Sequence, residues 1–166
     1  MKQNSLLPFK KILVPYDGSK LADKAFVYSI LIAKMTRESE IILLSTIEKI
    51  LAPSALFTIK VRSDKTGEDT TLSTYLDELQ KVMKSDMIRK LEEQKQRYKE
   101  FSINIRTVVL IGSPVNKIVK FAEEESVDLI IMGSKGLRGI PKVLKGLGSV
   151  SKSVSEKVNC TVILVR

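Results

Sequence analysis

The chain has 166 residues, of which 43% are hydrophobic and 28% are charged, and its formal net charge is +9. Because no apolar run approaches the ~20 residues of a membrane-spanning helix, that class is excluded. The absence of histidine excludes Ser-His-Asp and Cys-His catalysis, and the single cysteine, Cys160, has no partner for an internal disulfide. Since Met1–Lys11 carries no secretory signal, we expect a cytoplasmic protein folded as one domain over residues 1–166.

Apolar runs and helical patterns alternate along the chain. Continuous apolar strands that are covered by helices on both faces are typical of a parallel sheet, so the pattern predicts an α/β fold. The expected strands are 11–15, 41–44, 103–111, 128–132 and 161–165. The expected helices are 20–35, 71–99, 114–125 and a last one that begins near Ser149.

The stretch between the second and third strands is less regular. Residues 51–70 hold Pro53, Gly67 and several hydroxyl groups, and we expect a surface loop there, with a lid or a partner-binding segment as the alternative. The helix predicted over 71–99 has a candidate capping box at Thr74 and Asp77. Its last turns, 92–99, are almost wholly polar, so we expect them to project into solvent.

The first candidate binding residue, Asp17, directly follows the first strand. In doubly wound sheets ligands bind at the carboxyl ends of the strands, so Asp17 is placed to accept a hydrogen bond from a base or a ribose. The alternative is that Asp17 caps the helix that follows it. The residues alone leave both roles open.

Two glycine-rich turns mark a second candidate site, Gly133–Gly136 after the fourth strand and Gly148–Ser151 at the start of the last helix. Glycines let a backbone approach phosphate oxygens closely, and the amides and dipole of a helix N-terminus favour negative charge. The hydroxyl groups of Ser134, Ser149 and Ser151 would add donors. The alternative is a pair of structural turns in which Ser149 caps the helix.

The charge around these turns favours a phosphate ligand over an ordinary basic surface. Six cations lie there against one acid, Glu156: Lys135, Arg138, Lys142, Lys145, Lys152 and Lys157. The glycine spacing matches neither a P-loop nor a Rossmann fingerprint. The segment therefore predicts an anion site of a different kind.

At these residues the sequence resembles the universal stress protein family. The resemblance implies a five-stranded parallel sheet in the order 3-2-1-4-5 and a homodimer in which the fifth strands pair. It also implies ATP binding where the motif Gly-x-x-Gly-x9-Gly-[Ser/Thr] is kept. The likeness extends over 11–166, interrupted at the 51–70 loop, and rests on the segments 11–19, 112–114, 126–133 and 148–165 in order and spacing.

The resemblance also implies roles for individual residues in binding the nucleotide. Asp17 would contact adenine or ribose. The residues implied beside the base and at the end of the fourth strand are Pro15, Thr46, Met132 and Gly133. The residues implied at the ribose and the phosphates are Gly136, Gly148, Ser149 and Val150.

The glycine motif departs from the family pattern at one place. Nine residues after Gly136 lead to Gly146, which Leu147 follows instead of a serine or threonine. We therefore use the register that ends in Gly148-Ser149, because a phosphate-binding turn needs its donors next to the helix start. That register places two extra residues in the loop.

Together these features predict an ATP-binding, dimeric stress-response or signalling protein, with ADP or AMP as alternative ligands and Mg²⁺ arriving only with the nucleotide. No dedicated base is found, so hydrolysis is expected to be slow or absent. A nucleotide-free interaction scaffold of the same fold is the alternative, and an enzyme of the wider nucleotide-binding α/β group is a third. With aromatic residues at 5%, a nucleic-acid surface is not indicated, and the sequence does not identify a protein partner.

Overall fold

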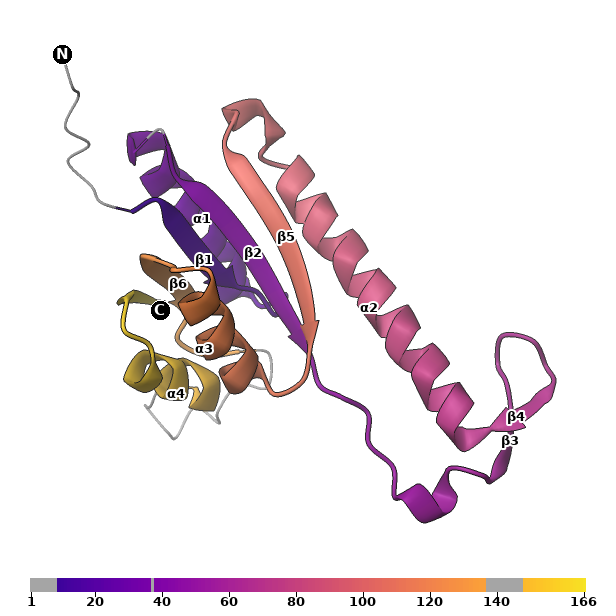
Figure 1. The fold of residues 1–166 in the computed structure, drawn as a ribbon. Helices are drawn as coiled ribbons and strands as arrows, with labels where there is room; N and C mark the ends of the chain where they lie inside the picture. Colours follow the sequence, from indigo (N-terminus) through magenta and orange to yellow (C-terminus); the bar gives the residue numbers. More distant parts are fainter. Residues whose placement is uncertain (1–8, 37, 137–147) are drawn as a thin grey trace.

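In a computed structural model, which describes residues 9–36, 38–136 and 148–166, five parallel strands form one open sheet. Their order across the sheet is β5-β2-β1-β6-β7 (Figure 1), which confirms the predicted order 3-2-1-4-5. The strands are β1 (Lys11–Pro15), β2 (Glu40–Ile47), β5 (Asn104–Ile111), β6 (Leu129–Gly133) and β7 (Thr161–Val165).

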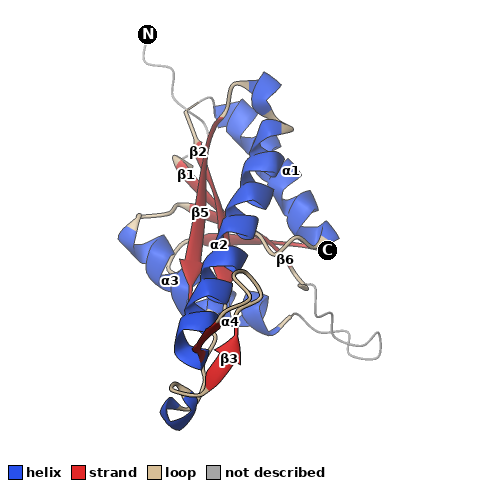
Figure 2. Ribbon diagram, turned by 90° about the vertical axis from the view of Figure 1, so that its right-hand side faces the viewer, coloured by secondary structure: helices blue, strands red, loops and turns tan. Residues whose placement is uncertain are grey.

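Helices cover both faces of the sheet (Figure 2). The helices are α1 (Lys20–Thr36), α2 (Leu72–Gln96), α3 (Pro114–Glu124) and α4 (Ser149–Lys157), with short 3-10 turns at Ser54–Leu56 and Lys99–Phe101. Side chains alternate along the central strands, so Ile12 and Val14 pack with α1 and the end of α2, whereas Leu13 packs with α3 and α4. The central strands β1, β2 and β6 are therefore buried on both faces, as their apolar runs predict, whereas the edge strands β5 and β7 are mostly half-buried or exposed.

Helix α2 differs from its prediction at both ends. It begins at Leu72 with Thr71 as its N-cap, whose hydroxyl oxygen accepts a hydrogen bond from Thr74 N at 3.3 Å, so the expected capping box is wrong. The prediction that the polar residues 92–99 project into solvent is also wrong, because this end of the helix packs on the body of the fold. Leu91 is fully buried, and just beyond the helix Tyr98 packs edge-on against Phe26 with their ring centroids 5.2 Å apart.

Residues 51–70, expected to be a loop, contain an antiparallel hairpin of β3 (Lys60–Arg62) and β4 (Asp69–Thr71). With most of α2, this segment forms an arm that extends past the carboxyl edge of the sheet (Figure 1). We define the arm as residues 48–90. It is fully described by the structure, and none of its apolar side chains is buried.

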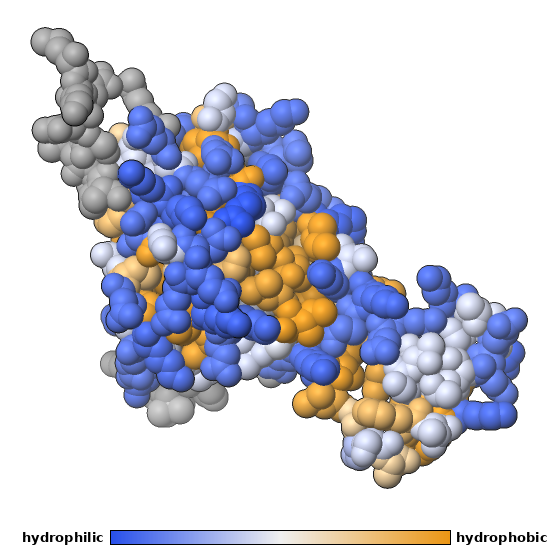
Figure 3. All heavy atoms as spheres, in the orientation of Figure 1, coloured by the Kyte–Doolittle hydropathy of each residue, from blue (hydrophilic) through white to orange (hydrophobic). Residues whose placement is uncertain are grey.

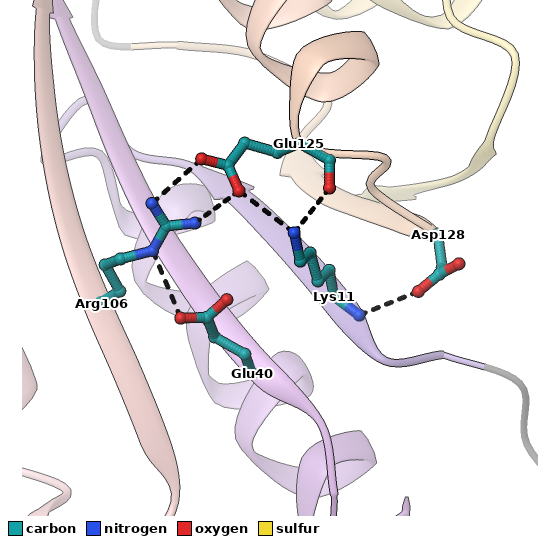
Figure 4. A network of polar contacts seen from close by, with 5 residues as sticks. All are labelled: Lys11, Glu40, Arg106, Glu125 and Asp128. Atoms are coloured by element: carbon teal, nitrogen blue, oxygen red, sulfur yellow. Dashed lines mark hydrogen bonds and ion pairs between the residues drawn. The ribbon is translucent and has the colours of Figure 1, made fainter.

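A network of charged groups joins the elements at the amino edge of the sheet (Figure 4). Arg106 binds Glu40 at 3.2 Å and Glu125 at 2.9 Å, and Lys11 Nζ lies 3.1 Å from the same Glu125 carboxylate. The backbone amide of Lys11 donates to Asp128 at 2.9 Å. These contacts fasten β1, β2, β5 and the end of α3 to one another, at the edge opposite to the predicted ligand site.

Candidate nucleotide site

The predicted site lies at the carboxyl ends of β1 and β6, which are neighbours in the sheet. The turn after β1 leads into α1, and the turn after β6 leads toward α4. Beyond Pro15 the pairing of β1 with β2 continues, because Tyr16 N donates to Leu44 O at 2.7 Å. The two loops thus leave the sheet side by side, at the place where strand order reverses in this class of fold.

The turn after β1 is fixed by its own hydrogen bonds. Asp17 Oδ1 accepts from Ser19 N at 3.0 Å, and Ser19 Oγ accepts from Ala22 N at 3.1 Å. Ser19 therefore caps α1, and the alternative that Asp17 is the cap is wrong. Gly18 sits in the left-handed region with φ of +81°, which suits a glycine in so tight a turn.

Asp17 and Gly136 bring the two loops into contact. A Cβ atom placed on Gly136 would lie only 2.7 Å from Asp17 Oδ2. Any larger residue at position 136 would therefore displace the Asp17 carboxylate. The first candidate residue and the first glycine-rich turn belong to one site.

The two glycine-rich turns also meet, as expected. Gly148 N donates to Ser134 O at 2.7 Å, and a Cβ atom on Gly148 would lie 3.3 Å from Lys135 Cα. Ser151 Oγ donates to the same Ser134 oxygen at 2.9 Å and also to Gly148 O. The amide of Gly148 and the hydroxyl of Ser151 are therefore engaged within the protein, and the role expected for Ser151 as a donor to a ligand is wrong.

The start of α4 provides the remaining donors. Gly148 is the N-cap, and within the described part of the chain no side chain caps this helix, so Ser149 occupies the first helical position and is not a cap. The amides of the first helical turn, those of Ser149, Val150 and Ser151, have no acceptor inside their own helix. With the helix dipole they form a positive end that favours an anion.

Other predicted site residues support the site from within the fold. Met132 is 5% exposed and packs in the layer of α3 and α4, where Val150 also packs in part, so neither side chain faces outward. A Cβ atom on Gly133 would lie 2.9 Å from Leu21 Cβ, so this glycine lets α1 approach β6. Thr46 is half-buried near the end of β2, two residues beyond Leu44, the partner of Pro15.

Sequence reasoning missed Tyr16, which binds the loop after β1 to two helices. Its hydroxyl donates to Asp23 Oδ1 at 2.5 Å, and Gln94 of α2 donates to the same oxygen at 3.5 Å. Burial, followed by the hydrogen bond to Asp23, raises the pKa of the Tyr16 phenol far above its usual value. No spacing in the sequence indicates this contact, because Asp23 looks like an ordinary acid in the first turn of a helix.

Part of the predicted basic rim lies outside the described residues. This holds for Arg138, Lys142 and Lys145, and also for Gly146 and Leu147, where the two alternative motif registers differ. Across the residues that the structure does describe, no three His, Cys, Asp or Glu side chains are grouped to hold a metal ion. Nor does any described helix have the length and apolar character to cross a membrane.

Comparison with known proteins places the chain in a family. The model of the universal stress protein family matches residues 8–166. The chain belongs to the universal stress protein family. Two relatives are each 31% identical to it: universal stress protein YxiE of Bacillus subtilis and universal stress protein MJ0577 of Methanocaldococcus jannaschii. The alignments cover 95% of this chain in both cases, and 99% and 95% of the two relatives.

Solved structures of universal stress proteins share the fold. The structure of MJ0577 superposes with a TM-score of 0.71 at 29% identity, covering 96% of each chain. A universal stress protein in complex with cAMP gives 0.61 at 21% identity, covering 95% of this chain and 97% of that one. An Arabidopsis thaliana member with AMP bound gives 0.57 at 18% identity, covering 94% and 90%.

Proposed function

We propose that this universal stress protein binds an adenine nucleotide at the carboxyl edge of its sheet, between the β1–α1 turn and the start of α4. One observation carries the proposal. A Cβ atom on Gly136 would lie 2.7 Å from Asp17 Oδ2, and Gly148 N donates to Ser134 O at 2.7 Å, so a carboxylate, two glycine turns and a helix N-terminus adjoin one another. A ligand with a polar ring or sugar at one end and an anion at the other fits this arrangement.

Different residues of the site bind the phosphates, the ribose and the base of the nucleotide. The amides of Ser149 and Val150 bind the phosphates, and the Ser149 hydroxyl, which is exposed, adds a donor. Asp17 accepts from the ribose or the base, whereas Gly136 allows the backbone to come close. Pro15 and Thr46 border the base.

The remaining predicted residues support the site without contacting the ligand through their side chains. Gly148 holds the two turns together, and Met132 and Gly133 support the site through packing. Lys135, which is half-buried beside Gly148, adds positive charge near the phosphates.

Relatives in the same fold family support an adenine nucleotide, since two of them hold cAMP and AMP. We propose ATP as the ligand of this chain, because α4 and the basic residues near it suit several phosphate charges, with Mg²⁺ carried in by the nucleotide. The chain offers no histidine as a base, and the Asp17 carboxylate is assigned to the ribose end. The protein therefore acts as a nucleotide-dependent binding module and not as an efficient hydrolase.

The proposed module works as a cytoplasmic homodimer through pairing of the β7 edge strands. β7 lies at the edge of the sheet, beside β6 alone, so its outer backbone groups are available for a second strand. The side chain of Ile163 on this strand is 38% exposed, as suits a residue that a second copy covers.

Calorimetric titration of the purified chain, freed of bound small molecules, tests the nucleotide. ATP is titrated with and without Mg²⁺, with ADP, AMP and cAMP as comparisons and GTP as the control for the base. We expect saturable binding of adenine nucleotides, with ATP tightest, and mass spectrometry of the untreated protein to detect the same ligand. If no adenine nucleotide binds, the nucleotide-free scaffold is the correct function.

A further inference from the structure

The arm, residues 48–90, exposes apolar side chains that the rest of the fold does not cover. Figure 3 shows apolar surface on the lower part of the arm, separate from the larger apolar area on the body of the molecule. Apart from Ile88, farther along α2, seven large side chains there are between 38% and 78% exposed: Leu51, Leu56, Phe57, Ile59, Leu79, Val82 and Met83. A contiguous apolar surface of this kind marks an interaction site.

These side chains belong to two segments that lie side by side. Ile50 N donates to Gln80 Oε1 at 2.9 Å, and Leu72 N donates to Ile59 O at 2.8 Å, so residues 50–59 run antiparallel to the first half of α2. On the helix, Leu79, Val82 and Met83 are spaced three and four residues apart and share one face. Exposed apolar side chains therefore come from two adjacent segments of the arm, and we call these seven side chains together the arm patch.

Hydrogen bonds within the arm fix its conformation in the single chain. Tyr75 of α2 donates to Asp64 in the hairpin at 2.6 Å, and Ser63 N donates to Glu68 O at 2.9 Å across the hairpin turn. Because the backbone is already ordered, docking on the arm patch loses less conformational entropy than docking of a free loop.

We propose that the arm patch binds the arm patch of a second copy of this chain, in an isologous contact separate from the β7 edge. The seven side chains expose on the order of 700 Å² together, close to the ~800 Å² that one partner contributes to a standard protein interface. Interfaces between identical subunits are also the most apolar class. Two α2 helices packed antiparallel around a two-fold axis place Leu79 and Met83 of each copy against the same residues of the other.

The charge of the arm favours a second copy over an anionic surface. The arm holds eight Lys and Arg residues against seven Asp and Glu, so it carries +1 of the chain's net +9. A membrane or nucleic-acid contact would draw the positive charge of the molecule into the contact, whereas here the charge lies elsewhere. Two copies that meet through nearly neutral arms keep their basic bodies apart.

Sedimentation of the full chain tests this contact. We expect Leu79→Asp and Met83→Asp to weaken self-association by about tenfold or more, because each buries a carboxylate in the apolar contact. Lys81→Gln is the matched control: it changes the charge of the same helix by the same single unit, two residues from both Leu79 and Met83 and almost on the opposite face, and should associate like the wild type. Equal association of all the variants, or a wild-type chain that stays monomeric through the micromolar range, would overturn the proposal.

Cross-linking separates the arm contact from pairing of β7. In a Cys160→Ser chain, Val82→Cys should form an intermolecular disulfide under mild oxidation, whereas Lys84→Cys, almost on the opposite face of the helix, should form little. Equal cross-linking of the two would overturn the arm contact while leaving a β7 dimer intact. Binding of the wild type to phosphatidylserine-containing vesicles that is lost in Phe57→Asp would assign the arm patch to a membrane surface and would equally overturn it.

Discussion

Asp17 uses its two carboxylate oxygens for different tasks. Oδ1 accepts from Ser19 N and holds the turn, whereas Oδ2 lies on the side of Gly136, where the ligand is proposed to bind. Removing the side chain therefore removes both a turn contact and a ligand contact. Asparagine keeps an oxygen for Ser19 and separates the two effects.

We expect Asp17→Ala to weaken nucleotide binding by about 5- to 150-fold, the equivalent of roughly 1–3 kcal/mol for a lost hydrogen bond at a charged acceptor. Asp17→Asn should keep the stability of the wild type and lose part of the affinity. Calorimetric titration gives the affinity, and thermal unfolding gives the stability. Asp64→Ala, which removes a carboxylate from the arm, is the control. An unchanged affinity in Asp17→Ala would restrict this residue to the turn.

The glycines at 136 and 148 should respond differently to the same substitution. In Gly148→Ala the new Cβ lies 3.2 Å from Ser134 O and 3.3 Å from Lys135 Cα, which are backbone atoms, so we expect a loss of about 1–3 kcal/mol in the free energy of unfolding. In Gly136→Ala the Cβ meets a side-chain oxygen of Asp17, which can rotate away. That variant should lose nucleotide affinity more than stability. Urea unfolding and titration of both variants check the contrast.

At the scale of the element, one part of α2 packs on the sheet and the other part is exposed in the arm. Its last turns pack on the sheet, where Leu91 is fully buried and Thr107 of β5 donates to Glu92 at 2.5 Å. Its residues 72–90 belong to the arm. A single helix therefore connects the body of the fold to the proposed contact between copies.

Alanine substitutions along α2 should reveal this division. Leu91→Ala is expected to lower the free energy of unfolding by about 2–5 kcal/mol, because it leaves a cavity in the core. Leu79→Ala, at a side chain that is 38% exposed, should change the stability of the monomer by no more than about 0.5 kcal/mol. Urea unfolding at low protein concentration measures both. A larger effect at Leu79 than at Leu91 would contradict the packing described above.

The strands were predictable because each contains an apolar run, and β1 and β7 have their predicted bounds of 11–15 and 161–165. The position of the first part of α2, away from the sheet, could not be predicted. The helical periodicity of Leu79, Val82 and Met83 indicates an apolar face but does not say what covers it. The meeting of Asp17 with the two glycine turns followed from strand order. The hydrogen bonds that Gly148 N and the Ser151 hydroxyl donate could not be predicted from the sequence. Both go to Ser134 O, and its position depends on the backbone of the turn after β6.

At the scale of the whole molecule, the charged network at the amino edge makes stability depend on pH. Hydrogen bonds from Arg106 and then Lys11 lower the pKa of Glu125 below its ordinary value. The carboxylate therefore stabilises the fold above the pKa of an unfolded glutamate, about 4.3, and this stabilisation is lost as the pH falls through the lower folded value.

Glu125→Gln should be less stable than the wild type at neutral pH, and the difference should shrink as the pH falls below about 4. Urea unfolding at a series of pH values measures it. Glu124→Gln is the control, since its partner Lys120 lies on the same helix and both side chains are more than 60% exposed. A constant difference across the series would mean that Glu125 acts through its shape and not through its charge.

The middle of α2 has a further consequence for the lifetime of the chain. From Lys81 to Lys90 every side chain is exposed except the half-buried Met87, so the helix there rests on its own backbone hydrogen bonds. Such a stretch opens locally at small cost, and it carries Lys81, Lys84, Arg89 and Lys90. Trypsin should cut here before it cuts the sheet, and the cut separates the arm from the part of α2 that packs on the sheet. A copy whose arm is not covered by a partner should therefore be digested faster.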